Sequence, residues 1–433
     1  MDILRTTFNT RHSTYKLMYL LISASIVIAS ILNLLLMVKI GSYNLRLSYI
    51  IIFFAFIFLL PFSSFRISFE VPYYKLFLFF IFIYFLATII NINSKYFTRG
   101  IADCLLLSLN FLHYLLIVSF LLKNNDYFHF LFKCLIFTGA ILSLIAMILI
   151  ITKFLGFDIP VFSYYKLSDW IYTNDYSLFP RLKYLEPVSG GFLATISLIG
   201  FSYWLLTHNK NKETNWILGA SVITFIVMIF SYSRGPILGF MVGFFLLLLL
   251  IFIRGKIHKM ILIKLLVILL IFITIFLMLY ALPMTRNIVF GRIRILLETD
   301  TGTVADRISW WKKMFAEFLD RPVLGYGASN YRKFREVVDT VGVSENIYIE
   351  ILHSSGILGF GIFVVINLLV IIKSMKIFFK KNLINKYLLS FLCGYACILT
   401  IAFTNPIAWS SFFWVVLACL VASSKLLIFP KDQ

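Results

Sequence analysis

Seven arginines gather in one polar segment of the chain, residues 282–346. A guanidinium group stays charged at a membrane interface and binds phosphate through two parallel hydrogen bonds, whereas lysine acts as a point charge. The basic segment 373–386 contains lysine and no arginine. The arginine-rich segment is therefore suited to phosphate, and a solvated loop touching lipid head groups is the alternative. Its arginines are Arg286, Arg292, Arg294, Arg307, Arg321, Arg332 and Arg335.

Two charged residues stand at the edges of apolar runs, where a charge is costly and often functional. Arg234 precedes the run 235–253 and could bind an anion or snorkel to lipid head groups. Glu345 precedes the run 347–372, where partial desolvation would make its carboxylate a better general base toward a hydroxyl group. A helix cap or first-turn acid is an equal alternative for Glu345.

Glu350 and His353 follow Glu345 in the same apolar run. In one continuous helix they would lie about one and two turns deeper in the membrane than Glu345. His353 shares a helix face with Glu345, eight residues earlier. We therefore expect His353 to be either a proton relay or a packed core histidine.

The composition of the chain indicates which kind of secondary structure must position these residues. Of 433 residues, 61% are hydrophobic and 13% are charged, too few charges to cover a water-soluble protein of this size. Lipid offers the backbone no hydrogen-bond partner, so the apolar runs must be helices. We predict an all-α, polytopic integral membrane protein with about twelve transmembrane helices. The predicted spans are 15–38, 47–63, 73–91, 101–122, 129–152, 188–207, 215–232, 235–253, 260–281, 347–372, 386–404 and 408–428.

The net charge of +20 does not require a nucleic-acid partner. Basic residues that flank apolar spans interact with anionic lipid and set the topology, so we expect membrane lipid as a partner and no nucleic acid. The first apolar run is too long for a cleaved signal and is expected to remain as a span. The cysteines lack a CxxC motif and a nearby histidine at ligand spacing, so we predict packing roles and no metal site. They are Cys104, Cys134, Cys393, Cys397 and Cys419.

The distribution of lysine and arginine predicts the topology. Short basic loops place both termini and segment 373–386 in the cytoplasm. The predicted organisation is residues 1–281 as helices one to nine with the outer loop 153–187, residues 282–346 as a large extracytoplasmic loop with amphipathic helices, and residues 347–433 as helices ten to twelve. Within the large loop, Ala305–Leu319 reads as an interfacial helix that Arg321-Pro322 ends, and LGYG at 324–327 reads as a tight turn. Its expected apolar face is Ile308, Trp311, Phe315 and Phe318.

Several short motifs surround this loop in a fixed order. SYSRG ends at Gly235, Asp306-Arg307 is followed by Trp310, and RPVLGYG spans 321–327. Glu345-Asn346 is followed after nine residues by Gly356 and then by Gly359. Together these motifs resemble the O-antigen ligase and polymerase (Wzy/WaaL) superfamily from about Arg181 to Gly359. Glutamate stands at 345, where the ligases have histidine, and the R-x-x-x-x-E-P sequence from Arg181 to Pro187 is similar to many repeat-unit polymerases.

The resemblance implies glycan transfer from an undecaprenyl-diphosphate carrier, without a cofactor or metal, at the outer face of the bacterial cytoplasmic (inner) membrane. Donor and acceptor would both be carrier-linked glycans, and a chain-length regulator is a possible partner. The catalytic candidates are Glu345 as base and Arg234 and Arg307 as diphosphate ligands. Glu186 could bind acceptor sugar or pair with an arginine. The substrate-binding candidates are Arg181, Glu186, Arg321, Asn346, Tyr348 and His353.

Three functions compete for this sequence. Loss of the ligase histidine favours a repeat-unit polymerase for O-antigen, capsule or exopolysaccharide, with the O-antigen ligase as the alternative. A polysaccharide transporter or flippase is a third class. A transporter of two six-helix halves would normally have a long central loop, but only a short loop joins predicted spans six and seven. The first five predicted spans also contain almost no mid-membrane charge beyond His113, so the transporter is the least favoured function.

Overall fold

The structure is a computed structural model. It describes residues 37–40, 43–46, 50, 53, 71–122, 125–154, 187–207, 212–230, 234–255, 259–281, 303–336, 346–380, 385–404 and 410–426. Three predicted site residues, Arg181, Glu186 and Glu345, lie outside these ranges, as does most of the predicted outer loop 153–187.

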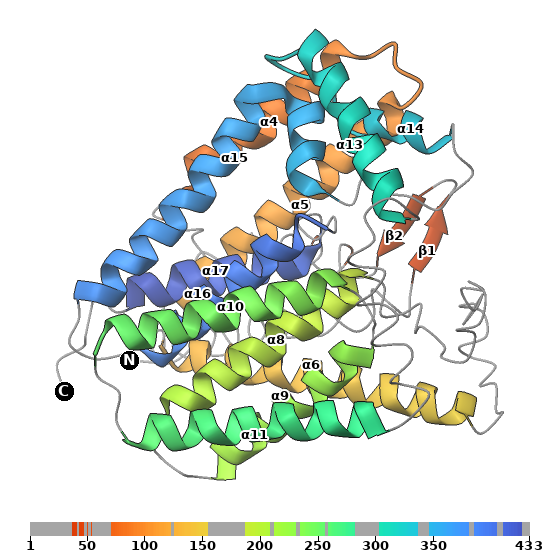
Figure 1. The fold of residues 1–433 in the computed structure, drawn as a ribbon. Helices are drawn as coiled ribbons and strands as arrows, with labels where there is room; N and C mark the ends of the chain where they lie inside the picture. The colour runs from red at the N-terminus through yellow and green to blue at the C-terminus, as the bar shows by residue number, and fades with distance from the viewer. Residues whose placement is uncertain are drawn as a thin grey trace, which may run out of the picture.

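Helices dominate the described residues (Figure 1). Six of the described helices are long and apolar enough to cross a membrane, and four shorter ones are also apolar. Each of these ten helices coincides with one of the predicted spans. The first two predicted spans lie almost wholly outside the described residues, so the number twelve stays a prediction. The helices are α4 (Tyr74–Ile90), α5 (Phe97–Leu121), α6 (Asn125–Phe154), α8 (Pro187–Leu206), α9 (Lys212–Phe230), α10 (Arg234–Ile253), α11 (Lys259–Ala281), α13 (Thr303–Asp320), α14 (Lys333–Glu336), α15 (Ile347–Lys380), α16 (Lys386–Ile401) and α17 (Ser411–Leu426), with a 3-10 turn, η3, at Asn330–Arg332.

The described residues confirm the predicted all-α class, and they also include one small β-hairpin. Strand β1 (Met37–Ile40) pairs antiparallel with β2 (Tyr43–Arg46), with Met37 opposite Arg46. The first predicted span was expected to remain helical through Val38, which instead lies in β1. The intervening Gly41-Ser42 is a pair that favours two-residue hairpin turns.

Small residues allow the central helices to approach closely. Helix α16 packs against both α8 and α10. Gly239 and Gly243 lie one turn apart on α10, and an added Cβ would stand 2.8 Å from the Cys397 carbonyl oxygen at the first and 2.7 Å from that of Cys393 at the second. Glycine at such positions lets helices pack where lipid supplies no hydrophobic driving force. None of the five cysteines forms a disulfide, and burial of Cys104, Cys393, Cys397 and Cys419 confirms the predicted packing role for these four.

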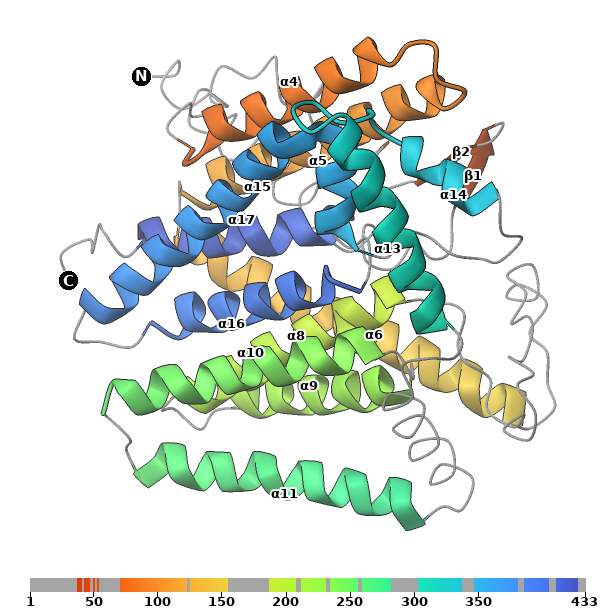
Figure 2. The same ribbon diagram turned by 45° about the horizontal axis from the view of Figure 1, so that its top comes forward.

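The longest helix, α15, is broken at Gly356, where φ is 63° and ψ is −167°. The ring centroids of Tyr348 and Phe363 are 6.2 Å apart, whereas fifteen residues of straight helix would separate them by about 22 Å. The helix therefore folds back at Gly356, and the bend is visible in Figures 1 and 2. We refer to residues 347–355 as the short arm and residues 357–380 as the long arm.

This bend corrects the predicted single span at 347–372. The short arm begins beside the end of α16, where the Ile347 amide donates to the Ala402 carbonyl oxygen at 3.0 Å. Its first turn lies beside Phe363 of the long arm, and His353 lies closer to the bend. The depth predicted for Glu350 and His353 in the membrane stays a prediction. The apolar pattern is continuous across Gly356, so periodicity alone could not reveal the break.

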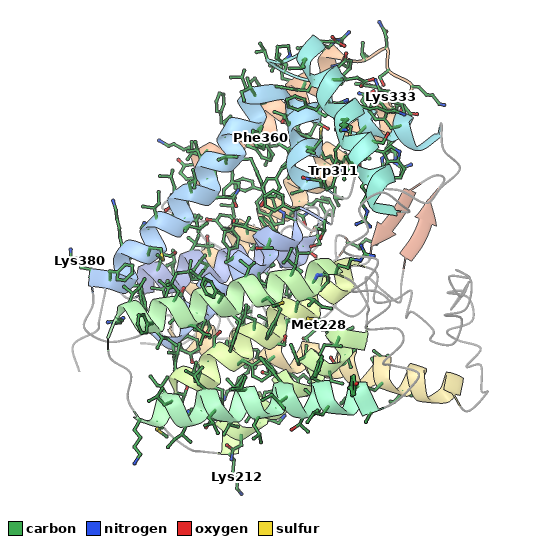
Figure 3. The ribbon with its side chains drawn as sticks, in the orientation of Figure 1. Lys212, Met228, Trp311, Lys333, Phe360 and Lys380 are labelled. Carbon is green, nitrogen blue, oxygen red and sulfur yellow. The ribbon has the colours of Figure 1, made fainter. Side chains whose placement is uncertain are left out.

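Charged contacts gather at opposite ends of the helix bundle. At one end, Glu213 pairs with Lys133 at 3.0 Å. Figure 3 shows Lys212 and Lys380 away from Lys333, which lies with α13 and the bend of α15 at the other end. The predicted topology assigns the first end to the cytoplasm and the second to the exterior, and this orientation stays a prediction.

Candidate functional site

The RPVLGYG motif binds the start of the long arm of α15. The Ile357 amide donates to the Pro322 carbonyl oxygen at 2.8 Å, and the Leu358 amide donates to that of Val323 at 3.4 Å. The first amides of a helix have no partner within it. The loop therefore supplies acceptors that the broken helix lacks, a requirement for irregular backbone within a membrane protein.

The same loop also binds the end of the short arm. The amides of Tyr326 and Gly327 donate to the carbonyl oxygens of His353 and Ser354, each at 2.9 Å. The last carbonyl groups of a helix are likewise without partners inside it. One loop thus satisfies both helix ends, which explains in structural terms why RPVLGYG and the Gly356 segment occur together.

Two glycines make this close approach possible. Gly325 and Gly356 both have positive φ, 69° and 63°. A Cβ on Gly356 would overlap the Val323 carbonyl oxygen, and a Cβ on Gly325 would overlap that of His353. The backbone conformation of Gly356 is also one that is almost restricted to glycine.

Helix α13 lies beside α15 and confirms the helix predicted at 305–319. Its buried face is Trp310, Met314 and Phe318, which are 8%, 1% and 9% exposed. Ile308 and Phe315, which belong to the predicted apolar face, are exposed. The apolar arc is wide enough for one part to pack on the protein while the rest remains available to the interface.

Glu317 and His353 join α13 to the short arm of α15. Their Oε2 and Nε2 atoms are 3.0 Å apart, and the His353 side chain is completely buried. His353 Nδ1 has no hydrogen-bond partner within the described ranges. His353 is therefore a packed histidine with one polar contact, which agrees with the second of the two sequence-based interpretations.

Positive groups surround this pair. Lys333 Nζ lies 2.6 Å from Glu317 Oε2. The Tyr326 ring stacks on His353, with centroids 5.2 Å apart, and Lys333 and Arg321 lie 4.7 Å and 4.8 Å from the Tyr326 centroid. Burial raises the pKa of Glu317, but the hydrogen bonds from His353 and Lys333 outweigh it, so this pKa lies below its ordinary value.

Arg332 belongs to a second polar cluster, between η3 and α5. Its Nη2 lies 3.9 Å from Asp103 Oδ2, and its Nε donates to Ser329 Oγ at 3.3 Å. The Ser329 hydroxyl in turn donates to the Asp103 carboxylate. Arg332 is thus engaged by the protein itself, which argues against the phosphate role that its segment suggested.

Tyr331 and Glu350 extend this cluster to the short arm. Glu350 is 2% exposed and Tyr331 is 7% exposed. The Tyr331 hydroxyl donates to the Glu350 carboxylate, and burial together with that carboxylate raises the pKa of Tyr331 well above its ordinary value. A buried carboxylate is tolerated when it is hydrogen-bonded and faces a cation, here Arg332.

The two predicted diphosphate ligands stand near the starts of their helices. Arg234 is the first residue of α10 and Arg307 lies in the second turn of α13, and both side chains are half-buried. Figures 1 and 2 place the starts of α10 and α13 toward the same side of the molecule. This placement is compatible with one shared anionic ligand.

Three other predicted binding residues have partners inside the protein. Asn346 caps α15, with its Oδ1 accepting from the Tyr348 amide at 3.0 Å. The Tyr348 hydroxyl donates to the Leu399 carbonyl oxygen at 2.9 Å. Arg321 is exposed and donates to the Asn91 side chain. Asn346 and Tyr348 therefore position the short arm, whereas Arg321 remains accessible.

Sequence reasoning missed Glu317, Lys333 and Asp103 as members of these clusters. Each lies far along the chain from its main partner, so no local spacing signals the contact. The only sequence hint is the polar Asn330–Lys333 run directly after LGYG. Across the described ranges, His, Cys, Asp and Glu form no group of three that could hold a metal ion.

Residues 219–364 match the family model Wzy_C, described as O-antigen ligase. The match includes Arg234, α13, the RPVLGYG loop and both sides of the Gly356 break. It confirms the resemblance of this segment to the O-antigen ligase and polymerase superfamily and indicates glycosyl transfer of the ligase or polymerase type. No curated protein matches the chain.

Proposed function

We propose that the chain is a polysaccharide repeat-unit polymerase of the bacterial cytoplasmic membrane, with its site facing the exterior. It would transfer a growing glycan from one undecaprenyl-diphosphate carrier to a carrier-linked repeat unit. The observation that carries this proposal is the family match, because it covers the segment in which Arg234, Arg307 and Glu345 lie.

The proposed reaction needs one base and a cationic site for the leaving group. The acceptor hydroxyl oxygen bonds to the sugar C1 as the bond from C1 to the diphosphate oxygen breaks. The hydroxyl proton passes to the Glu345 carboxylate, and undecaprenyl diphosphate departs with the bonding electron pair. Arg234 and Arg307 would stabilise the charge that develops on the diphosphate, which requires no metal.

The ligase is the second candidate, because the matched family model is described as O-antigen ligase. It would use the same donor and leaving group but transfer the glycan to a lipid A core. Glutamate at 345, where the ligases have histidine, favours the polymerase.

Purified protein in proteoliposomes can separate the two functions. Carrier-linked repeat units alone should yield a ladder of carrier-linked oligomers, and lipid A core should not be consumed. Product on lipid A core without a ladder would establish the ligase instead. Absence of both products under conditions that support a known polymerase would contradict the proposal.

A further inference from the structure

The catalytic groups proposed above are carried by two separate elements. Arg307 lies on α13, and Glu345 directly precedes Asn346 at the start of the short arm of α15. Transfer to a fixed acceptor requires these groups to keep one relative position, because a displacement of about 1 Å can cost a hundredfold in rate. A contact that joins the two elements is therefore able to control the reaction without touching substrate.

The short arm is connected to α13 by backbone bonds as well as by direct packing. Its carbonyl groups bind the RPVLGYG loop, which follows α13 after Asp320. These bonds fix the bend, and burial of Trp310, Met314 and Phe318 turns one face of α13 toward the protein. Glu317 lies on the buried side of α13, between Trp310, Met314 and Phe318, and contacts His353 from there.

The hydrogen bond between Glu317 and His353 has a defined direction, because the groups around it hold both side chains in place. Glu317 accepts from His353 Nε2, and Lys333 Nζ holds the same carboxylate oxygen. Tyr326 stacks on one His353 face at an interplanar angle of 12°, and Phe334 meets the ring edge-to-face at 70°. Packing holds the His353 imidazole in one orientation, and its bond through Nε2 therefore fixes the position of the Glu317 carboxylate.

We propose that Glu317 is a positioning residue, which acts through His353 to fix the helix that carries Arg307 against the short arm that follows Glu345. This inference rests on the proposed function for its kinetic consequence. The contact itself is a property of the fold and can be tested without any assay of activity.

A kinetic experiment tests the consequence. Glu317→Ala should lower kcat for carrier-linked repeat units at least about tenfold and change KM less than about twofold, because the diphosphate ligands remain. The exchange Glu317→His with His353→Glu restores the pair across the same elements and should recover most of kcat. The control is Glu213→Ala, which removes contacts to His129 and Lys133 at the other end of the bundle and should leave kcat unchanged.

Limited trypsin cleavage tests the contact directly. Lys312 and Lys313 are exposed on α13, and a loosened helix is cleaved faster at these lysines. Glu317→Ala should speed cleavage there, the exchanged pair should restore resistance, and Glu213→Ala should have no effect. If Glu317→Ala does not fold, Glu317→Gln keeps an acceptor for Nε2 and should show a smaller change in the same direction.

The two readouts separate failure of the inference from failure of the proposed function. Unchanged cleavage at Lys312 and Lys313 in Glu317→Ala would overturn the positioning role. Loss of kcat with unchanged cleavage and no recovery by exchange would also overturn it, because Glu317 would then act chemically. A wild-type protein that forms no glycan product would refute the proposed function, and the cleavage result would still decide the contact.

Discussion

Gly325 and Gly356 face each other across the junction between the RPVLGYG loop and α15. A Cβ on Gly325 would come within 2.7 Å of the Gly356 amide nitrogen, so neither position has room for a side chain. Because both glycines also have positive φ, sterics and backbone conformation impose the same requirement. The bend in α15 therefore depends on these two residues.

Gly356→Ala should destabilise the protein by about 1 to 3 kcal/mol or more, because alanine is strained in this conformation and overlaps the Val323 carbonyl oxygen. Unfolding of the purified protein in mixed micelles would measure the change. Gly361→Ala is the matched control, since Gly361 lies in the long arm and a Cβ there would meet nothing within 4 Å. Equal stability of the two variants would contradict the described bend.

Arg234→Lys and Arg307→Lys should each lose most activity although the charge is kept. Lysine cannot reproduce the bidentate contact to a diphosphate oxygen pair. Loss of one such contact should cost roughly 2 to 4 kcal/mol at the transition state. Glycan ladders near wild-type length and amount, at matched protein levels, would show that these arginines only anchor their helices.

The contribution of Glu317 to stability should depend on pH. The pKa of Glu317 is lowered from its ordinary value of 4.5, so its stabilisation is fully present above that value and is lost as the pH falls through the folded-state pKa. The stability difference between wild type and Glu317→Ala should stay constant down to about pH 5 and shrink below pH 4.5. A stability difference between wild type and Glu317→Ala that increases as the pH falls would contradict this prediction.

The predicted topology can be tested with single cysteines in a cysteine-free protein. Ser309 on α13 and Lys380 at the end of α15 are both exposed, and Figures 1 and 3 show α13 and Lys380 at opposite ends of the bundle. An impermeant maleimide applied to intact cells should label Ser309→Cys and spare Lys380→Cys. Labelling of Lys380→Cys alone would reverse the orientation, and the proposed site would then face the cytoplasm.

Much of the helical framework could be predicted from sequence. Apolar runs between charged loops mark the ten apolar helices because lipid leaves the backbone no alternative to helix. The end of α13 at Arg321-Pro322 was also predictable, since proline disfavours helical conformation in the residue before it. The hairpin at 37–46 was missed because its residues adjoin a strongly apolar run.

The arrangement of the site was much less predictable. The family motifs identify the loop and Gly356, but they do not show that one binds the other. The contacts of Glu317 with His353 and of Tyr331 with Glu350 join residues that are distant in sequence. Folding of the short arm back along the long arm brings them together, and that bend depends on the conformations of Gly325 and Gly356.

The most direct test of the proposed chemistry is Glu345→Gln in purified membranes supplied with carrier-linked repeat units. The amide preserves the size of the side chain but cannot accept a proton from the acceptor hydroxyl. General-base catalysis typically contributes about a hundredfold to ten-thousandfold, so repeat-unit transfer should fall at least a hundredfold with folded protein still present. Glu345→His should recover part of the rate, because imidazole can take the same proton. Wild-type rates from Glu345→Gln would show that the Glu345 carboxylate is not needed for transfer and would contradict its assignment as the base.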